Sequence, residues 1–137
     1  MKMTHITVHC SATPPSMDIG VPRIRQMHLD RGFNDIGYHC VIRRNGEREI
    51  GRSIEIQGAH VGGHNPGNIG VCLVGGIDED GKPEANFTFQ QYQALHHTVM
   101  ELRRVHDIPK ENVLGHRDWP GVKKACPCFE VREFFDA

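Results

Sequence analysis

Histidine and cysteine are the residues of this chain with the most evident capacity for chemistry: the sequence has 10 histidines and 5 cysteines in 137 residues. Three of them, His9, His116 and Cys126, are far apart in the chain, yet each ends or follows a segment that we expect to be extended. Catalytic zinc sites use three protein ligands of the His, Cys or carboxylate type and leave a fourth position for water. These residues are one candidate set, although no two of them form a compact local pair that would fix a metal.

The segment KKACPCF, residues 123–129, allows four interpretations: a disulfide, a redox pair, a metal ligand or core packing. The cysteines are Cys10, Cys40, Cys72, Cys126 and Cys128. An odd number of cysteines in a chain that we expect to be cytosolic argues against disulfides. The single proline between Cys126 and Cys128 also differs from the two-residue spacing of redox motifs. We expect the cysteines of the apolar segments to be packing residues.

Most other histidines have an ordinary structural interpretation. His96 and His97 are adjacent in a predicted helix, so they point in different directions and cannot chelate an ion as an i, i+4 pair. We expect them to lie at the surface. The same surface position is predicted for His5, His28, His39 and His106, with His28 and His39 as candidates to help position a cleft.

A functional role is expected for Lys124 and Tyr38 only if the metal site exists, and Lys123 is considered with them as the neighbour of Lys124. By default the lysines are a solvated pair and the tyrosine packs with its hydroxyl at the surface. Lys124, however, lies two residues before Cys126. A metal held by Cys126 would bring this ammonium group close to negative charge that develops on a substrate oxygen.

Strands and helices that must carry these residues alternate along the chain. The strands are predicted at His5–Cys10, in a hairpin of 38–44 and 47–51 around Asn45-Gly46, at Ile69–Val74 and at 113–114. The helices are predicted at 21–31, at 88–106 and at 131–135, where the pattern indicates a short helix. The glycine-rich segment 62–70 is predicted to be a loop. This order predicts a mixed α/β fold with one sheet covered by helices.

Composition narrows the class of protein. With 16 basic and 17 acidic residues the formal charge is -1, which gives no field suited to nucleic acid or an anionic membrane. No apolar run approaches the ~20 residues that span a bilayer, and the N-terminus lacks a signal-peptide pattern. We therefore expect a soluble cytosolic protein with one domain, residues 1–137, and no membrane insertion.

Six segments in the same order resemble the zinc-dependent N-acetylmuramoyl-L-alanine amidases of the type 2 family, which includes phage lysozymes and, more distantly, peptidoglycan recognition proteins. The segments are VHCSAT (8–13), DIGYHCVIRRNG (35–46), GAHVGGHNPGNIGVCLVGGID (58–78), NFT (86–88), GHRD (115–118) and KKACPCF (123–129). The resemblance runs from about residue 5 to the end and implies the mixed sheet of that family.

Carried over by position, the resemblance implies one Zn²⁺ per chain with His9, His116 and Cys126 as ligands. It also implies catalytic roles for Tyr38 and Lys124. His60 falls in the cleft-lining segment of the family, where a substrate contact is implied. Asp118 is a rival third ligand, but its two-residue step from His116 fits the family pattern poorly.

The function implied is hydrolysis of the amide between N-acetylmuramic acid and L-alanine in peptidoglycan. The phage-like segments favour an endolysin, held in the cytoplasm of a host cell and reaching the wall through a separate membrane lesion. One alternative is a peptidoglycan-binding module that does not cleave, and another is a cytosolic amidase that recycles muropeptides. Binding to a phage RNA polymerase, known in one branch of the family, has no support in this sequence.

Overall fold

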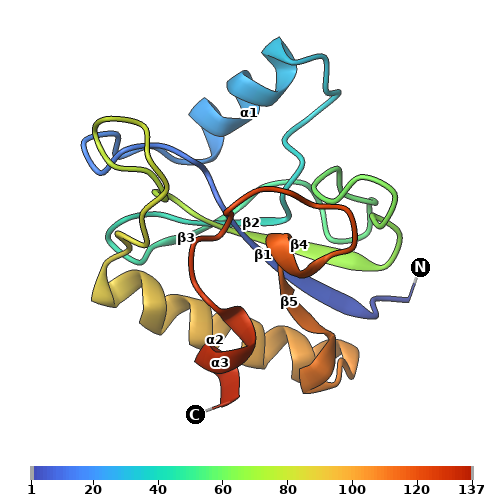
Figure 1. Ribbon diagram of the computed structural model, residues 1–137. Helices are drawn as coiled ribbons and strands as arrows, with labels where there is room; N and C mark the ends of the chain where they lie inside the picture. The colour runs from blue at the N-terminus through green and yellow to red at the C-terminus, as the bar shows by residue number, and fades with distance from the viewer. Residues whose placement is uncertain (1, 137) are drawn as a thin grey trace.

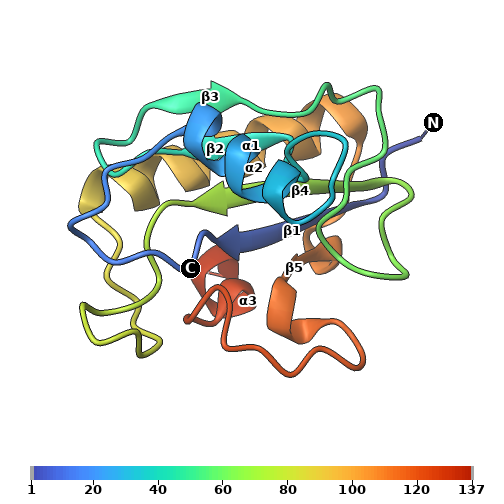
Figure 2. The ribbon, with the colours of Figure 1, turned by 90° about the horizontal axis from the view of Figure 1, so that it is seen from above.

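A five-stranded sheet is the centre of the computed structural model, which describes residues 2–136. The strands are β1 (His5–Cys10), β2 (Cys40–Ile42), β3 (Arg48–Ile50), β4 (Asn68–Leu73) and β5 (Val113–Gly115). The helices are α1 (Val21–Asp30), α2 (Phe89–His106) and α3 (Val131–Asp136), and the short 3-10 helices η1 (Lys110–Asn112) and η2 (His116–Asp118) flank β5. Figure 2 shows the strand order β3-β2-β4-β1-β5. The predicted mixed α/β fold is confirmed.

Parallel pairing joins β2, β4, β1 and β5, and only β3 is antiparallel to its neighbour β2. β4 lies in the middle of the sheet, and every residue of it is buried, as its apolar sequence predicts. β1 has the predicted bounds. Since the parallel strands end at one edge of the sheet, this edge is where residues from their carboxyl ends meet.

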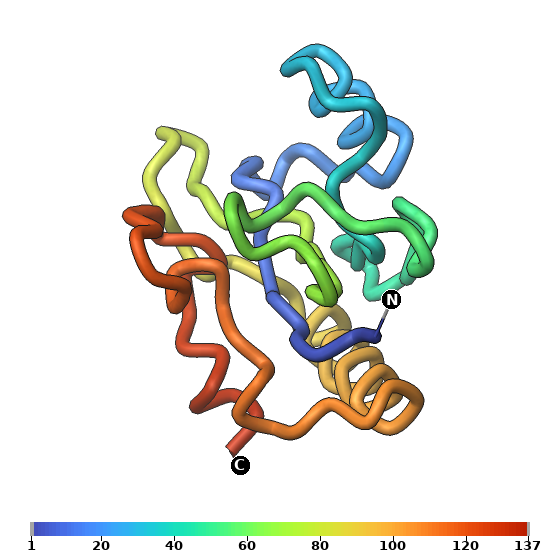
Figure 3. Tube along the Cα trace, turned by 90° about the vertical axis from the view of Figure 1, so that its right-hand side faces the viewer, coloured from blue at the N-terminus to red at the C-terminus, as the bar shows by residue number. Residues whose placement is uncertain are grey.

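The two faces of the sheet are covered by different helices, and the alternation of side chains along the strands decides which residue faces which helix. Ile6, Val8 and Cys10 of β1 pack in the same core cluster as Leu95 and Val99 of α2. His9 therefore points to the opposite face. Figures 1 and 3 show α1 on that side of the sheet, across from α2.

Both long helices follow their predicted bounds within a residue. In α2, Thr88 is the N-cap: its hydroxyl accepts from the Gln91 N–H at 3.1 Å, and the Gln91 side chain accepts from the Thr88 N–H at 2.9 Å. Val105 belongs to the apolar pattern of the helix but is 60 % exposed. No helix within residues 2–136 is long and apolar enough to cross a membrane.

The predicted hairpin exists, with shorter strands and a different turn. The Gly46 N–H donates to the Arg43 carbonyl at 2.8 Å and the Arg43 N–H donates to the Glu47 carbonyl at 2.9 Å. Gly46 has a positive φ of 88°, while Asn45 does not. The connection is thus a three-residue turn ending in a left-handed glycine, rather than a two-residue turn with two positive φ angles.

Candidate metal centre

His9, His116 and Cys126 come together at the carboxyl edge of the sheet. His9 lies near the end of β1 and is 1 % exposed, whereas His116 opens η2 directly after β5. One ligand atom from each residue lies within 4.8 Å of the other two, and the two imidazole centroids are 4.5 Å apart. Ligand atoms around a tetrahedral zinc are separated by roughly 3.3–3.8 Å, so a small contraction of this group would enclose such an ion.

Backbone contacts hold Cys126 beside β1. The Cys10 N–H donates to Cys126 Sγ at 3.1 Å, and the Arg117 N–H donates to the Cys126 carbonyl at 2.9 Å. These two hydrogen bonds fix the sulfur of Cys126 at the carboxyl end of β1. The hydrogen bond with Cys126, together with burial, raises the pKa of the Cys10 thiol, which therefore stays protonated. All five cysteines are free, as predicted.

Asp118, the rival ligand, has a structural partner instead. Its Oδ2 accepts from the Gly115 N–H at 2.8 Å and closes the start of η2. The group of three potential ligands formed within residues 2–136 contains Cys126 and not Asp118. A carboxylate engaged in this way is poorly placed to replace the thiol.

His60 lies within hydrogen-bond distance of His9. Its Nδ1 lies 2.9 Å from His9 Nε2, and its Nε2 lies 2.8 Å from the Asn68 carbonyl oxygen. The side chain is 8 % exposed, and burial lowers the pKa of its imidazole to about 4. Burial, followed by the neighbouring His60, also lowers the pKa of His9 well below its usual value. Both rings are therefore neutral near pH 7.

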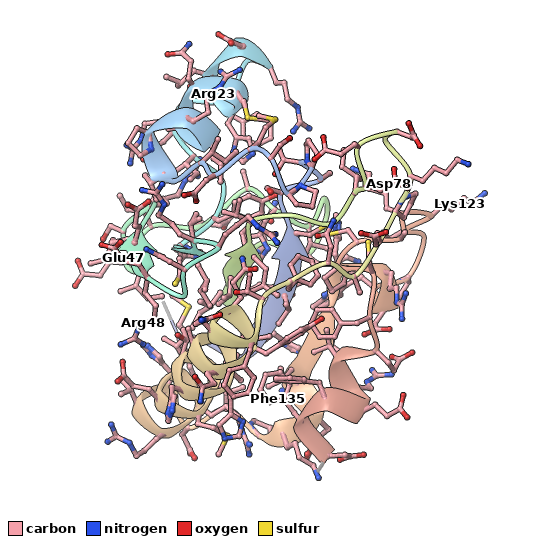
Figure 4. All side chains as sticks on the ribbon, turned by 90° about the vertical axis from the view of Figure 1, so that its left-hand side faces the viewer. Arg23, Glu47, Arg48, Asp78, Lys123 and Phe135 are labelled. Atoms are coloured by element: carbon pink, nitrogen blue, oxygen red, sulfur yellow. The ribbon has the colours of Figure 1, made fainter. Side chains whose placement is uncertain are left out.

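A cleft of about 270 Å³ opens beside the candidate ligands. Its walls carry all three of the other predicted site residues: Tyr38, His60 and Lys124. The Tyr38 ring is half-buried with its centroid 5.0 Å from that of His9, and burial raises the pKa of its hydroxyl well above 10. Lys124 is exposed, as is Lys123, which Figure 4 shows at the outer edge of the molecule.

The predicted surface position is wrong for His28 and His39, which are 6 % and 5 % exposed. His28 Nδ1 accepts from the Gly37 N–H at 2.8 Å, and His39 Nδ1 accepts from the Gly70 N–H at 3.0 Å. Each ring thus satisfies a buried backbone donor, and His28 lines the cleft whereas His39 does not. His96 and His97 are exposed, as expected.

Some residues of the cleft had no role in the sequence prediction. Arg31, Phe33 and Asn65 are of this kind, whereas His28, which lines the cleft from α1, is one of the two histidines that the sequence offered as candidates to help position it. The helical period gave a signal for His28, which follows the buried Val21 at a spacing of two turns. Asn65 has no such signal, because its effect depends on the shape of its loop: its Oδ1 accepts from the N–H groups of residues 60 and 61.

A larger cavity, of about 740 Å³, lies between β3 and α2. The described residues that line it include Cys40, Leu102 and Val105, but none of the three candidate metal ligands. Convergent polar groups, rather than volume, therefore identify the site for chemistry.

Comparison with known proteins bears on both the fold and the site. Residues 1–129 match the family model described as N-acetylmuramoyl-L-alanine amidase. The endolysin of Enterobacteria phage K11 is 50% identical over 127 residues, which is 93% of this chain and 82% of that protein.

Solved structures give the same result for the fold. The N-acetylmuramoyl-L-alanine amidase LysC from Clostridium intestinale URNW superposes with a TM-score of 0.83 at 25% identity, covering 99% of this chain and 85% of that one. PGRP-SA of Apis mellifera has the same fold at 19% identity, with a TM-score of 0.78 over 99% of this chain and 82% of that one. The predicted type 2 amidase fold is confirmed.

Proposed function

The chain belongs to the N-acetylmuramoyl-L-alanine amidase family and is a peptidoglycan amidase, and we propose that it acts with one zinc ion held by His9, His116 and Cys126. The bond cleaved is the amide between N-acetylmuramic acid and L-alanine. We assign the whole of residues 1–137 to one amidase domain. The single observation that carries the zinc assignment is the convergence of the three ligand atoms within 4.8 Å.

The chemistry of the donor set fits zinc. Two imidazoles and one thiol are ligands that zinc takes in tetrahedral sites, and three protein ligands leave a position open. The Cys10 N–H at 3.1 Å holds Cys126 Sγ in place, and the low pKa of His116, about 4 because of burial, keeps that ring neutral. When bound, zinc supplies Lewis-acid polarisation of the scissile carbonyl and activation of water at neutral pH.

Lys124 and Tyr38 are two further polar residues that line the cleft. Attack on the amide carbonyl develops negative charge on its oxygen, and the ammonium group of Lys124 would stabilise that charge. The Tyr38 hydroxyl keeps its proton at neutral pH, because burial raises its pKa. It can therefore donate a hydrogen bond that positions water or substrate, and it is unsuited to be the general base.

A binding module that does not cleave is the alternative from another functional class. Such a module needs the cleft but gains nothing from a thiol placed against two neutral imidazoles. The Cys126 thiol and the exposed Lys124 beside it therefore favour the enzyme.

The test is hydrolysis of purified sacculi by the zinc-loaded protein. We expect hydrolysis to expose the amino group of L-alanine at the N-terminus of the stem peptide. A chelator should abolish this activity, and added zinc should restore it. Binding of sacculi without release would instead support the non-cleaving module. Faster cleavage of soluble anhydromuropeptides than of sacculi would point to a recycling enzyme.

The biological role that we propose is that of an endolysin, in keeping with the phage endolysin relative. The partner is then the peptidoglycan of the host wall. The protein would be stored in the host cytoplasm and would reach its substrate after a separate lesion of the membrane. Lysis of host cells only when the membrane is permeabilised would support this role.

A further inference from the structure

Two consecutive hydrogen bonds connect the candidate ligand His9 to the backbone of β4. His9 Nε2 lies 2.9 Å from His60 Nδ1, and His60 Nε2 lies 2.8 Å from the Asn68 carbonyl oxygen. Both contacts are buried. The inference drawn from this chain of groups rests on the proposed function, because it concerns how His9 is presented to zinc.

The carbonyl oxygen at the end of this chain fixes the position of each proton. A carbonyl only accepts, so His60 Nε2 must carry a hydrogen and donate it to Asn68. An imidazole whose one hydrogen is on Nε2 has a bare Nδ1, and this nitrogen of His60, 2.9 Å from His9 Nε2, accepts from His9. The His9 hydrogen must therefore be on Nε2, which leaves Nδ1 as the nitrogen with a free lone pair.

Close packing prevents the His60 ring from turning away from this arrangement. A Cβ atom added at Gly70 would lie 2.8 Å from His60 Cδ2 and Cγ, and one added at Gly58 would lie 2.8 Å from His60 Cδ2. The ring thus fills a slot between two glycines that no larger residue could form. Asn65 fixes the backbone at the same place, since its Oδ1 accepts from the His60 N–H at 2.9 Å.

The acceptor at the far end is also held in place. The Asn68 side chain accepts from the Thr7 hydroxyl at 2.8 Å, and its Nδ2 donates to the His64 carbonyl at 3.0 Å. The indole N–H of Trp119 in turn donates to the Thr7 hydroxyl at 2.9 Å. Every group that orients His60 is therefore itself bonded to a neighbour.

We infer that His60 is a positioning residue, which sets the His9 ring in the Nε2–H tautomer and directs His9 Nδ1 to the zinc ion. Histidine ligands of metals generally donate their second N–H to a carboxylate, a carbonyl or water, and this partner determines which nitrogen binds. Here a second histidine, His60, has that role, and a backbone carbonyl in turn orients His60. This goes beyond the substrate contact that the family resemblance implies for His60.

A matched pair of variants separates the two ends of the His60 ring. In His60→Asn the amide oxygen takes roughly the place of Nδ1 and can still accept from His9. In His60→Gln the amide nitrogen takes roughly the place of Nε2 and can still donate to Asn68, but the acceptor for His9 is lost. The inference predicts zinc affinity weakened about 10- to 100-fold in the Gln variant and largely restored in the Asn variant.

His39→Gln is the control for a structural effect. Its ring is buried to a similar degree and bonds the Gly70 N–H and the Ile56 carbonyl, neither of which belongs to a candidate ligand. It should lower thermal stability while leaving zinc affinity unchanged. A change in zinc affinity as large as that of His60→Gln would contradict the inference.

The tautomer itself is read from long-range proton–nitrogen NMR correlations of the histidine rings, in metal-free and zinc-loaded wild-type protein. We expect His9 to carry its proton on Nε2 in both states. A proton on Nδ1 would overturn the inference even if the His60 variants failed to fold. A purely substrate-contacting His60 would instead raise KM in both variants with no change in zinc affinity.

Failure of this inference is distinguishable from failure of the proposed function. If wild-type protein neither bound zinc nor cleaved sacculi, the proposed function would be wrong. If wild-type protein bound zinc and the His60→Gln variant bound it equally well, only the positioning role would be wrong.

Discussion

The two sides of the candidate metal centre are built in contrasting ways. His9 lies near the end of β1, between two parallel neighbours in the sheet, is 1 % exposed, and contacts His60 and Tyr38. The segment after β5 carries His116, Lys124 and Cys126, and Lys124 in it is exposed and lines the cleft. The strand side is held by buried side chains, while the loop side is held mainly by backbone hydrogen bonds.

This difference suggests that the strand side gives the metal site its rigidity and that the loop side gives substrate access to it. A ligand on a buried strand has its position set when the sheet folds, so it adds little entropy cost when a metal binds. A loop can present a charged group to a substrate that arrives from solvent. The strand side should therefore control how tightly metal is held, and the loop side should control turnover once its thiol is in place.

Removing the thiol should have the largest effect. We expect Cys126→Ser to lose most zinc on dialysis and to fall to background activity, because a serine hydroxyl is a much poorer zinc ligand than a thiolate. The control is Cys128→Ser in the same loop, whose Sγ lies 3.3 Å from the Gly76 carbonyl and can be replaced there by a hydroxyl. Zinc content by elemental analysis, with activity on sacculi, measures both.

Unchanged zinc content in Cys126→Ser would remove Cys126 from the ligand set. Zinc loss of equal size in Cys128→Ser would mean that the loop as a whole, rather than one sulfur, determines binding.

Lys124→Ala tests the catalytic role of the loop side. Loss of one group that stabilises an oxyanion lowers kcat by about 10²–10³-fold. Zinc content should not change, because Lys124 is not among the clustered ligands. Lys123→Ala is the matched control, since this exposed neighbour does not line the cleft. Wild-type turnover in zinc-replete Lys124→Ala would exclude the assigned role.

The contrast between the two sides also explains what could be predicted from the sequence. Strand and helix positions were predictable because their signals are local: β-branched alternation for β1, and a cap with a helical period for α2. The turn at Gly46 was predicted in place but not in type, because the number of residues in the loop depends on which cross-strand bonds close it.

The candidate ligands were identified by family resemblance rather than by local spacing. Their convergence depends on the order of strands in the sheet, which brings positions 9 and 116 to one edge. The His9–His60 bond joins residues 51 positions apart and requires a glycine slot that exists only in the folded chain. For the same reason the burial of His39 was missed: its partner is a backbone N–H on another strand.

Acid should destabilise the metal-free protein, and mostly through this histidine cluster. Burial lowers the pKa of His60 and of His116 to about 4 in the folded protein, against an ordinary value near 6.5 in the unfolded chain. Between these values the unfolded chain binds protons that the folded chain excludes, so the free energy of unfolding decreases as pH falls from about 6.5 to about 4. Above about 6.5 these groups add no pH dependence.

His60, the buried ring on the strand side, should contribute roughly 3 kcal/mol of this loss, because its pKa differs by about 2.5 units between the folded and unfolded states. Urea denaturation of metal-free protein at several pH values measures it, and His60→Asn should flatten the curve. His97→Asn, at an exposed position, is the control and should leave the curve as in wild type. An equally steep acid dependence in His60→Asn would show that the strand side does not carry the effect.

Tyr38→Phe should have the smallest effect on kcat. It tests a residue that lines the cleft and also contacts His9 on the strand side. The substitution keeps the ring, whose centroid is 5.0 Å from that of His9, and removes only the hydroxyl. Because that hydroxyl is protonated at neutral pH, its loss removes one neutral hydrogen bond, worth about tenfold in kcat. The control is Tyr92→Phe, the chain's other tyrosine, which belongs to α2 and packs against the core. Zinc loss in Tyr38→Phe would mean that the hydroxyl supports the ligands, and an unchanged kcat would mean that the ring alone matters.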